Sequence, residues 1–189
     1  MATAVTTDDR YTSERYFRLV EEGVLGPDDR VELLDGVIVA MAPSGPAHAT
    51  VVNQAAQALI LAVASRAAVR VQAPLVASGL SAPEPDIAVV PGALKDYLTA
   101  HPATALLVVE VSDSSLPQDR ITKARIYAGA SVPEYWILNL REDCVEVLRA
   151  PDPQARCYRE HRIARRGEHL ELTALAGASL TVDELLASR

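Results

Sequence analysis

Apolar residues gather in short runs along this chain, and turn-forming residues separate the runs. Residues 105–111, ALLVVEV, are apolar at successive positions, as expected of a strand that is covered on both faces. DIAVV at 86–90 predicts a second strand of the same kind. An Asp35-Gly36 pair divides the apolar runs of VELLDGVIVA, which predicts a β-hairpin.

Helical periodicity marks other segments. Residues 47–66 place Val51, Val52, Ala55 and Leu59 on one face together with His48, which predicts a core helix. A further helix is expected over 116–130, where a proline stands in the first turn and a glycine near the end. A short helix is predicted over 12–22. Further strands are predicted over 68–77, 132–140, 143–150 and 155–164.

These elements predict an α/β fold in which helices flank a central mixed β-sheet. The length of 189 residues fits a single domain over 1–189. We expect residues 1–11 to be flexible. Hydrophobic residues make up 49% of the chain but aromatic residues only 4%, so aliphatic side chains must build the core.

Charge and cysteine content narrow the function classes. The net charge of −7 argues against a protein that coats nucleic acid by bulk attraction. It is compatible with an acidic pocket that holds a divalent cation. No apolar run is long enough to span a bilayer, and the N-terminus does not resemble a secretory signal. With only two cysteines, which are not expected to pair, these features predict a cytoplasmic protein.

Two carboxylates stand at the ends of the two buried strands. Asp86 begins the strand 86–90 and Glu110 lies near the end of 105–111, a separation of 24 residues (110 − 86). A connection of this length allows the strands to be neighbours, so the two acids could meet. Clustered buried acids repel each other unless a cation neutralises them, and Mg²⁺ typically takes one or two carboxylates. Alternatively, each acid is a solvated residue at a strand end.

The helix after the second strand carries a lysine on a partly apolar face. Lys123 shares its side of the helix with Ile126 and Tyr127. A lysine above two acids could orient or deprotonate a metal-bound water, or stabilise charge on a phosphoryl oxygen. The alternative is a surface ion pair between Asp119 and Lys123, which are four residues apart.

These motifs together resemble a known family. PEPDIAVV followed by LLVVEVSDSSLPQDRITKARIYAGASVPEYWILNL is similar to the restriction endonuclease family of the Uma type, within the PD-(D/E)xK nuclease superfamily. The upstream segment VELLDGVIVAMAPSGPAH matches that family's hairpin and the histidine that follows it. The resemblance covers roughly residues 14–150.

The resemblance implies a restriction-endonuclease-like core and a set of site residues. Asp86, Glu110 and the carbonyl of Val111 would hold Mg²⁺ or Mn²⁺. Ser112 replaces the lysine of the ExK triplet, and Lys123 on the next helix would take its place as the catalytic lysine. Supporting positions that match the family are Glu32, His48, Asp119 and Tyr127.

The roles of these four supporting positions are less specific. Glu32 would be a third acid near the metal or a cap of the hairpin. His48 would be a satisfied core residue, or it would support a metal ligand or bind a phosphate. Asp119 and Tyr127 would orient Lys123 and close the pocket.

Two functions follow as hypotheses. The first is divalent-metal-dependent phosphodiester hydrolysis, with DNA as substrate, by an endonuclease that acts as a homodimer when it cuts both strands. The second is a non-catalytic relative that binds nucleic acid or a protein partner on the same fold. The trio Asp86, Glu110 and Lys123 favours the enzyme, because a binding module does not require it. Hydrolysis of RNA or of another phosphodiester remains a further possibility.

Overall fold

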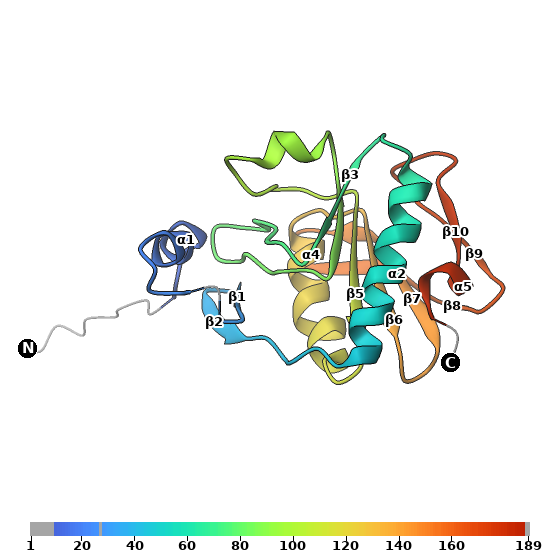
Figure 1. Ribbon diagram of the computed structural model, residues 1–189, viewed down its shortest axis with the longest axis horizontal. Coiled ribbons are helices and arrows are strands. Elements are labelled where there is room, and N and C mark those ends of the chain that lie inside the picture. Colours follow the sequence, from blue (N-terminus) through green and yellow to red (C-terminus); the bar gives the residue numbers. More distant parts are fainter. Residues whose placement is uncertain (1–9, 27, 188–189) are drawn as a thin grey trace, which may run out of the picture.

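A computed structural model describes residues 10–26 and 28–187, so most of the segment 1–11 that was predicted to be flexible lies outside the described residues. Its centre is a six-stranded sheet with the order β3-β4-β5-β6-β7-β8 (Figure 1). The pair β5 and β6 is parallel, whereas the other neighbours are antiparallel. The predicted mixed sheet is therefore confirmed. The strands are β3 (Ala68–Val71), β4 (Ile87–Val90), β5 (Leu107–Ser112), β6 (Glu134–Asn139), β7 (Cys144–Asp152) and β8 (Cys157–Arg165).

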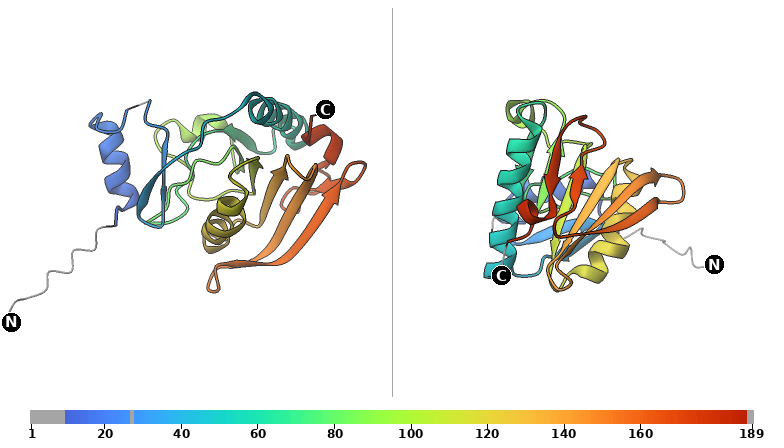
Figure 2. Two further views of the ribbon diagram at one scale, coloured as in Figure 1. Left: turned by 90° about the horizontal axis from the view of Figure 1, so that it is seen from below. Right: turned by 90° about the vertical axis from the view of Figure 1, so that its right-hand side faces the viewer.

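Helices cover both faces of this sheet. The long helix α2 (Pro46–Val63) lies on one face and α4 (Ala124–Gly129) lies on the other (Figure 2). Along β5, Leu107, Val109 and Val111 join the core under α2, whereas Val108 joins the core under α4. This alternation follows from the two-residue period of a strand. It places the next two side chains of the second set, Glu110 and Ser112, on the α4 side.

The helical segment after β5 is continuous but not uniform. It begins as α3 (Leu116–Gln118), passes through a π-helical turn η2 (Asp119–Lys123) and ends as α4. The predicted helix over 116–130 is thus found, with a wider turn inside it. Single π-turns of this kind are frequent at functional sites.

The N-terminal part forms a separate layer beside the sheet (Figure 1). Helix α1 (Ser13–Glu21) is capped by Thr12, and a hairpin joins β1 (Val31–Leu34) to β2 (Val37–Ala40). At its turn Asp35 and Gly36 have φ angles of 48° and 83°, which suits an Asp-Gly pair. The Asp35 carboxylate is paired with Arg125 and Arg156, so the hairpin tip is tied to the main body.

The remaining elements are short. A 3₁₀ helix η1 (Leu94–Tyr97) follows β4, and the chain closes with β9 (His169–Glu171), β10 (Ser179–Thr181) and α5 (Val182–Leu185). The strand predicted over 68–77 is wrong in its second half, because β3 ends at Val71. The next residue, Gln72, has a φ angle of 45°, which takes the chain out of the extended conformation.

Two further expectations concern cysteines and membranes. Cys144 and Cys157 are both free, as expected. Among the residues that the model describes, none of the helices combines the length and the apolar character needed to cross a bilayer.

Candidate active site

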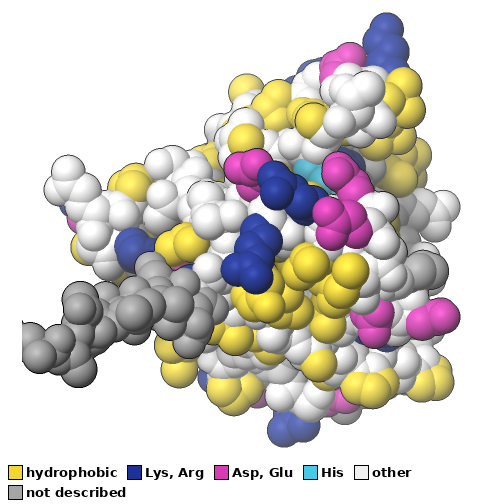
Figure 3. Space-filling model, turned by 90° about the vertical axis from the view of Figure 1, so that its left-hand side faces the viewer, with side chains coloured by type: hydrophobic (Ala, Val, Ile, Leu, Met, Phe, Trp, Pro, Cys, Tyr) yellow, Lys and Arg dark blue, Asp and Glu magenta, His cyan; other side chains and the backbone are white. Residues whose placement is uncertain are grey.

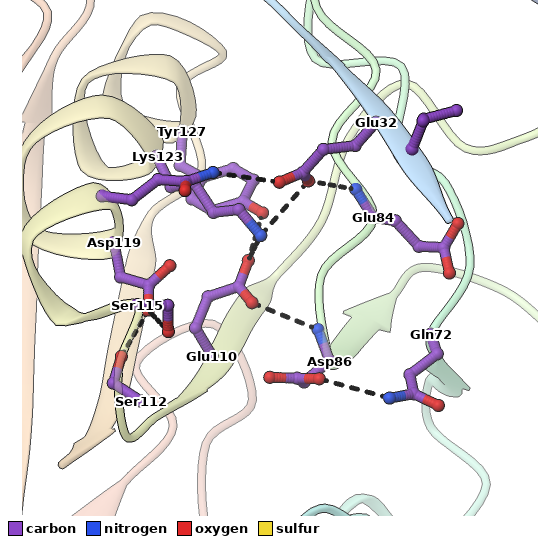
Figure 4. Close-up of polar contacts among 12 residues, drawn as sticks. Glu32, Gln72, Glu84, Asp86, Glu110, Ser112, Ser115, Asp119, Lys123 and Tyr127 are labelled. Carbon is purple, nitrogen blue, oxygen red and sulfur yellow. Dashed lines mark hydrogen bonds and ion pairs between the residues drawn. The ribbon is translucent and has the colours of Figure 1, made fainter. Parts of the chain in front are cut away.

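The antiparallel pairing of β4 and β5 brings the two predicted acids together. Ile87 lies opposite Val109, so the residue before β4 lies next to the residue after Val109. The backbone N–H of Asp86 donates to Glu110 Oε2 at 3.4 Å. A strand head and a strand end thus meet at one edge of the sheet, as the spacing predicted (Figure 4).

The two oxygens of Asp86 are held unequally. Oδ2 accepts a hydrogen bond of 2.9 Å from the Val111 N–H and lies 3.2 Å from His48 Nε2. Oδ1 receives only a long bond of 3.4 Å from Gln72 Nε2. Burial raises the pKa of Asp86, but His48, the Val111 N–H and the charge of Lys123 together outweigh burial, so the pKa of Asp86 is lowered. The ionised form of Asp86 is therefore favoured.

Glu110 shows the same asymmetry between its oxygens. Oε1 accepts from Tyr127 Oη at 2.7 Å and from Lys123 Nζ at 3.0 Å. Oε2 has the 3.4 Å contact with the Asp86 N–H. Burial raises the pKa of Glu110 well above its usual range, and Asp119 and Asp86 add to that rise while Lys123 opposes it. In the absence of a bound cation, this site is an unfavourable place for a charged glutamate.

Lys123 bridges two acids from distant parts of the chain. Besides Glu110, its Nζ lies 3.2 Å from Glu32 Oε2, which comes from β1. Burial lowers the pKa of Lys123, but the negative charges of Glu110 and Glu32 outweigh it and raise the pKa. Lys123 is buried and paired with these two acids, so the alternative of a surface ion pair with Asp119 is wrong.

Glu32 is an acid of the site and does not cap its own hairpin. Its Oε2 accepts from the Glu84 N–H at 3.0 Å and its Oε1 accepts from Gln118 Nε2 at 3.2 Å. The β1–β2 hairpin therefore reaches over the sheet edge and supplies one wall of the site (Figure 4).

Asp119 lies on the opposite wall. Its Oδ2 accepts hydrogen bonds from Ser112 and, at 2.7 Å, from Ser115. Ser112, which stands where the superfamily has a lysine, thus positions Asp119. Among the described residues, these hydroxyl groups are the hydrogen-bond partners of the Asp119 carboxylate. No hydrogen bond or ion pair joins Asp119 to Lys123 within that part of the chain, so the geometry does not support the expectation that Asp119 orients Lys123 directly.

His48 lies in the first turn of α2 and points at Asp86. Its hydrogen bond to Asp86 is the first cause of a raised pKa for the imidazole. Its Nδ1 is the single buried side-chain nitrogen or oxygen among the described residues without a hydrogen-bond partner. His48 is therefore not a satisfied core residue, and the interpretation in which it supports Asp86 fits the geometry.

These side chains surround a cavity of about 120 Å³. Tyr127 is fully buried behind Glu110, whereas the other predicted site residues line the cavity. Its carboxylates outnumber its lysine and arginine: Glu32, Glu84, Asp86, Glu110, Asp113 and Asp119 face Arg30 and Lys123. Glu84, Ser115 and Gln118 were missed from the sequence, because they lie in loops or at a helix start with no periodic signal.

The donor set fits a hard divalent cation held by few protein ligands. Asp86 and Glu110 each keep one oxygen with only a 3.4 Å partner, and these oxygens belong to adjacent side chains. Within residues 10–26 and 28–187, no group of three or more His, Cys, Asp or Glu side chains is arranged so that it could hold a metal ion. Mg²⁺ does not need one, because it keeps several waters and binds through one or two carboxylates.

The architecture, a mixed six-stranded sheet flanked by helices, is of the restriction-endonuclease-like class. Residues 13–183 match the model of the family described as "Uma2: Putative restriction endonuclease", and the chain belongs to that family. The resemblance found in the sequence is thereby confirmed. No curated protein matches the chain.

A solved structure supports the fold independently. The chain is similar to a crystal structure from Anabaena variabilis described as "a putative nuclease belonging to DUF820". The TM-score is 0.73 at 14% sequence identity, over 92% of this chain and 96% of the other. The similarity establishes the fold, and the details of the site come from the contacts described above.

Proposed function

We propose that this protein is a divalent-metal-dependent phosphodiesterase that acts as a DNA endonuclease. The observation that carries the proposal is the pair Asp86 and Glu110, which lie side by side at one sheet edge, each with one weakly bonded oxygen; Glu110 is buried and Asp86 is partly buried. Asp86, Glu110 and the Val111 carbonyl would hold Mg²⁺ or Mn²⁺. Such an ion, when bound, polarises a phosphodiester and lowers the pKa of a water molecule.

The other residues position and balance this pair. Lys123 places a positive charge against Glu110 and is close enough to the cavity to donate to a phosphoryl oxygen. Tyr127 fixes the Glu110 carboxylate from the core, and His48 fixes Asp86 from α2. Such supporting partners typically contribute 10- to 100-fold to activity or metal affinity, so we expect roughly that range for each of them.

The direct test is nicking of supercoiled plasmid DNA with Mg²⁺ and with Mn²⁺. Wild type should nick, EDTA should abolish nicking, and Glu110→Gln should be inactive. Glu142→Gln is the matched control, because Glu142 is an exposed acid that does not line the site cavity. Equal nicking by wild type and Glu110→Gln would indicate a contaminant and overturn the role of Glu110.

The second candidate is a non-catalytic relative that binds nucleic acid or a protein on this fold. The net charge of −7 favours it, because that charge opposes broad attraction to phosphate. Figure 3 shows one face on which basic side chains alternate with acidic and hydrophobic ones. A binding module predicts no Mn²⁺-induced rise in melting temperature that depends on Glu110, whereas the enzyme predicts one.

A homodimer remains part of this proposal. Cutting both strands of a duplex requires two sites, and a symmetric dimer would supply them. Light scattering coupled to gel filtration would measure the mass directly. A monomer that linearises plasmid in a single binding event would contradict the dimer.

A further inference from the structure

A second hollow adjoins the site cavity and has no role in the chemistry described so far. Its volume is about 460 Å³, and it shares Arg30, Met41, Ser44 and Glu84 with the site cavity. It lies between the start of α2 and the end of β3. This size is in the range of pockets that hold small organic groups.

The walls of the hollow combine apolar surface with amide groups. Val52 from α2, Val71 from β3 and Met41 supply the apolar part. Asn53, about two turns after the α2 start, and Gln72, just after β3, supply side-chain amides. A flat group with an apolar face and a hydrogen-bonding edge matches this combination, and a nucleobase has both.

The charge of the hollow argues for a neutral occupant. Asp29 and Glu84 face Arg30, so the lining carries more acid than base. A phosphate would be repelled there, whereas a base would not. Arg30 makes one long hydrogen bond, 3.5 Å to Ser44 Oγ, and lines both cavities. It is placed to contact a phosphate between the hollow and the site.

Gln72 connects the hollow to the proposed metal ligand. Its backbone N–H donates to the Asp86 carbonyl at 3.0 Å, and its Nε2 donates to Asp86 Oδ1 at 3.4 Å. Its φ angle of 45° is uncommon for a residue other than glycine. Backbone in such a conformation tends to persist at functional sites. An occupant that hydrogen-bonds to the Gln72 side-chain amide would therefore lie close to Asp86.

We infer that the hollow receives the base of an unpaired nucleotide next to the cleaved phosphodiester. This inference rests on the proposed phosphodiesterase function and names its substrate class: nucleic acid that is single-stranded, or locally unpaired, at the cleavage point. In a duplex the base is stacked and paired, so it must leave the stack before it can enter the hollow. Recognition through a base also suits an acidic protein, which gains little from bulk attraction to phosphates.

The test is binding of a fluorescein-labelled 12-nucleotide DNA strand, of its RNA counterpart and of the blunt DNA duplex of the same sequence. Fluorescence anisotropy in Ca²⁺ buffer gives the dissociation constants, and a denaturing gel checks that the strands stay intact. Two variants alter the hollow at exposed positions of α2: Asn53→Leu removes an amide and Ala49→Trp fills space. Gln57→Leu, an exposed position of α2 that does not line the hollow, is the control.

The expected result is that single strands bind about tenfold more tightly than the duplex, and that each hollow variant loses about tenfold in single-strand affinity. A tenfold loss in affinity corresponds to about 1.4 kcal/mol. Gln57→Leu should bind like wild type. Circular dichroism melting shows whether each variant is folded, and the two variants act independently. Comparison of the DNA and RNA strands identifies the preferred sugar.

Two outcomes would overturn the inference: equal affinity for duplex and single strand, or wild-type single-strand affinity in both variants. The proposed function has a separate readout, which is Mn²⁺-dependent hydrolysis of methyl p-nitrophenyl phosphate by wild type. This diester has no base. If wild type does not hydrolyse this diester, the proposed phosphodiesterase function is contradicted. The binding comparison would then still decide whether the hollow receives a base.

Discussion

Two groups of buried carboxylates lie in this molecule, and they differ in how their oxygen atoms are bound. Glu134 on β6 is fully buried, and its Oε1 accepts from Trp136 Nε1 at 2.9 Å and from Arg149 Nε at 2.7 Å. Its Oε2 accepts from both the N–H and the hydroxyl of Thr173, at 3.0 and 2.9 Å. Both oxygens are thus saturated by short hydrogen bonds, and the charge has its own arginine.

Glu146 on β7 follows the same rule. Arg120 binds it through Nε and Nη2, with a shortest distance of 2.6 Å, and Asn139 adds a bond of 3.1 Å. In contrast, Glu110 and Glu32 share one lysine, and Asp86 and Glu110 each keep an oxygen with a 3.4 Å contact. The acids of the first group are fully paired within the fold, whereas the second group keeps excess negative charge and the weakly bonded oxygens that the proposed function assigns to a cation.

Replacing the basic side chain that pairs with each group of acids should distinguish the two groups most clearly. Lys123→Met leaves two buried acids without their lysine and should lower the free energy of unfolding by about 4 kcal/mol in EDTA. Mn²⁺ should restore part of that loss, because a bound ion stabilises the folded state. Chemical denaturation with and without Mn²⁺ measures both.

Arg149→Met is the matched variant, because Arg149 neutralises Glu134. It should lose about 3 kcal/mol, and Mn²⁺ should restore nothing. Equal rescue of the two variants by Mn²⁺ would show that the ion acts nonspecifically and would break the comparison.

Replacing the acids should reverse the order of the two stability losses: the variant at Glu134 should lose more than the variant at Glu110. Glu134→Gln should lose about 3 kcal/mol, since Arg149 would be left partly buried beside a neutral group. Glu110→Gln should be more stable than Glu134→Gln in EDTA, because the native site penalises the charged form of Glu110. Urea denaturation of the two variants beside wild type provides the measurement. A loss for Glu110→Gln as large as that for Glu134→Gln would refute the distinction.

The pH dependence of stability should also differ in sign, in metal-free buffer. Burial raises the pKa of Glu110 above its unfolded value of 4.5, so the folded state binds more protons and the contribution of Glu110 falls as pH rises through 4.5. Burial also raises the pKa of Glu146, but Arg120 and Asn139 outweigh it and leave the pKa lowered. Its contribution is therefore present above pH 4.5 and is lost as pH falls through the folded pKa.

These opposite signs are checked by subtracting the stabilities of Glu110→Gln and Glu146→Gln from that of wild type from about pH 2 to about pH 7, a range that extends to both sides of the ordinary carboxyl pKa. Each difference should change by at most about 1.4 kcal/mol per pH unit. Parallel slopes for the two variants would contradict the assignment of the two groups.

The smallest expected effect is at Tyr127, which tests the support of Glu110 without changing charge. Tyr127→Phe removes the 2.7 Å hydrogen bond to Oε1 and should cost about 1 kcal/mol of stability. Activity on plasmid should fall by about tenfold, as for other residues that orient a metal ligand. An unchanged rate would show that Lys123 alone is enough to hold the carboxylate.

The sequence predicted the parts of this site that rest on local pattern. Two apolar runs with an acid at one end of each define β4 and β5, and a 24-residue separation permits antiparallel neighbours (110 − 86). The Asp-Gly pair predicted the hairpin that carries Glu32. The two apolar runs and the Asp-Gly pair each lie within a few consecutive residues, so they could be recognised without knowledge of the tertiary packing.

Other features could not be predicted, because they depend on contacts between distant segments. The π-turn over Asp119–Lys123 places Asp119 against Ser112 while Lys123 reaches Glu110, and a regular helical wheel does not contain it. Gln72 turns the chain away from β3 in a conformation that Gln rarely adopts. The hydrogen bonds that join Glu134 to Arg149 and Thr173 likewise could not be predicted from the sequence. They identify Glu134 as a buried acid with a structural role.

Calorimetric titration of the protein with Mn²⁺ tests the central claim most directly. We predict that wild type and Glu146→Gln bind the ion, whereas Asp86→Asn and Glu110→Gln do not. Binding that survives in Asp86→Asn and Glu110→Gln, or a wild type that binds no Mn²⁺, would contradict the assignment of this sheet edge as a metal-dependent active site.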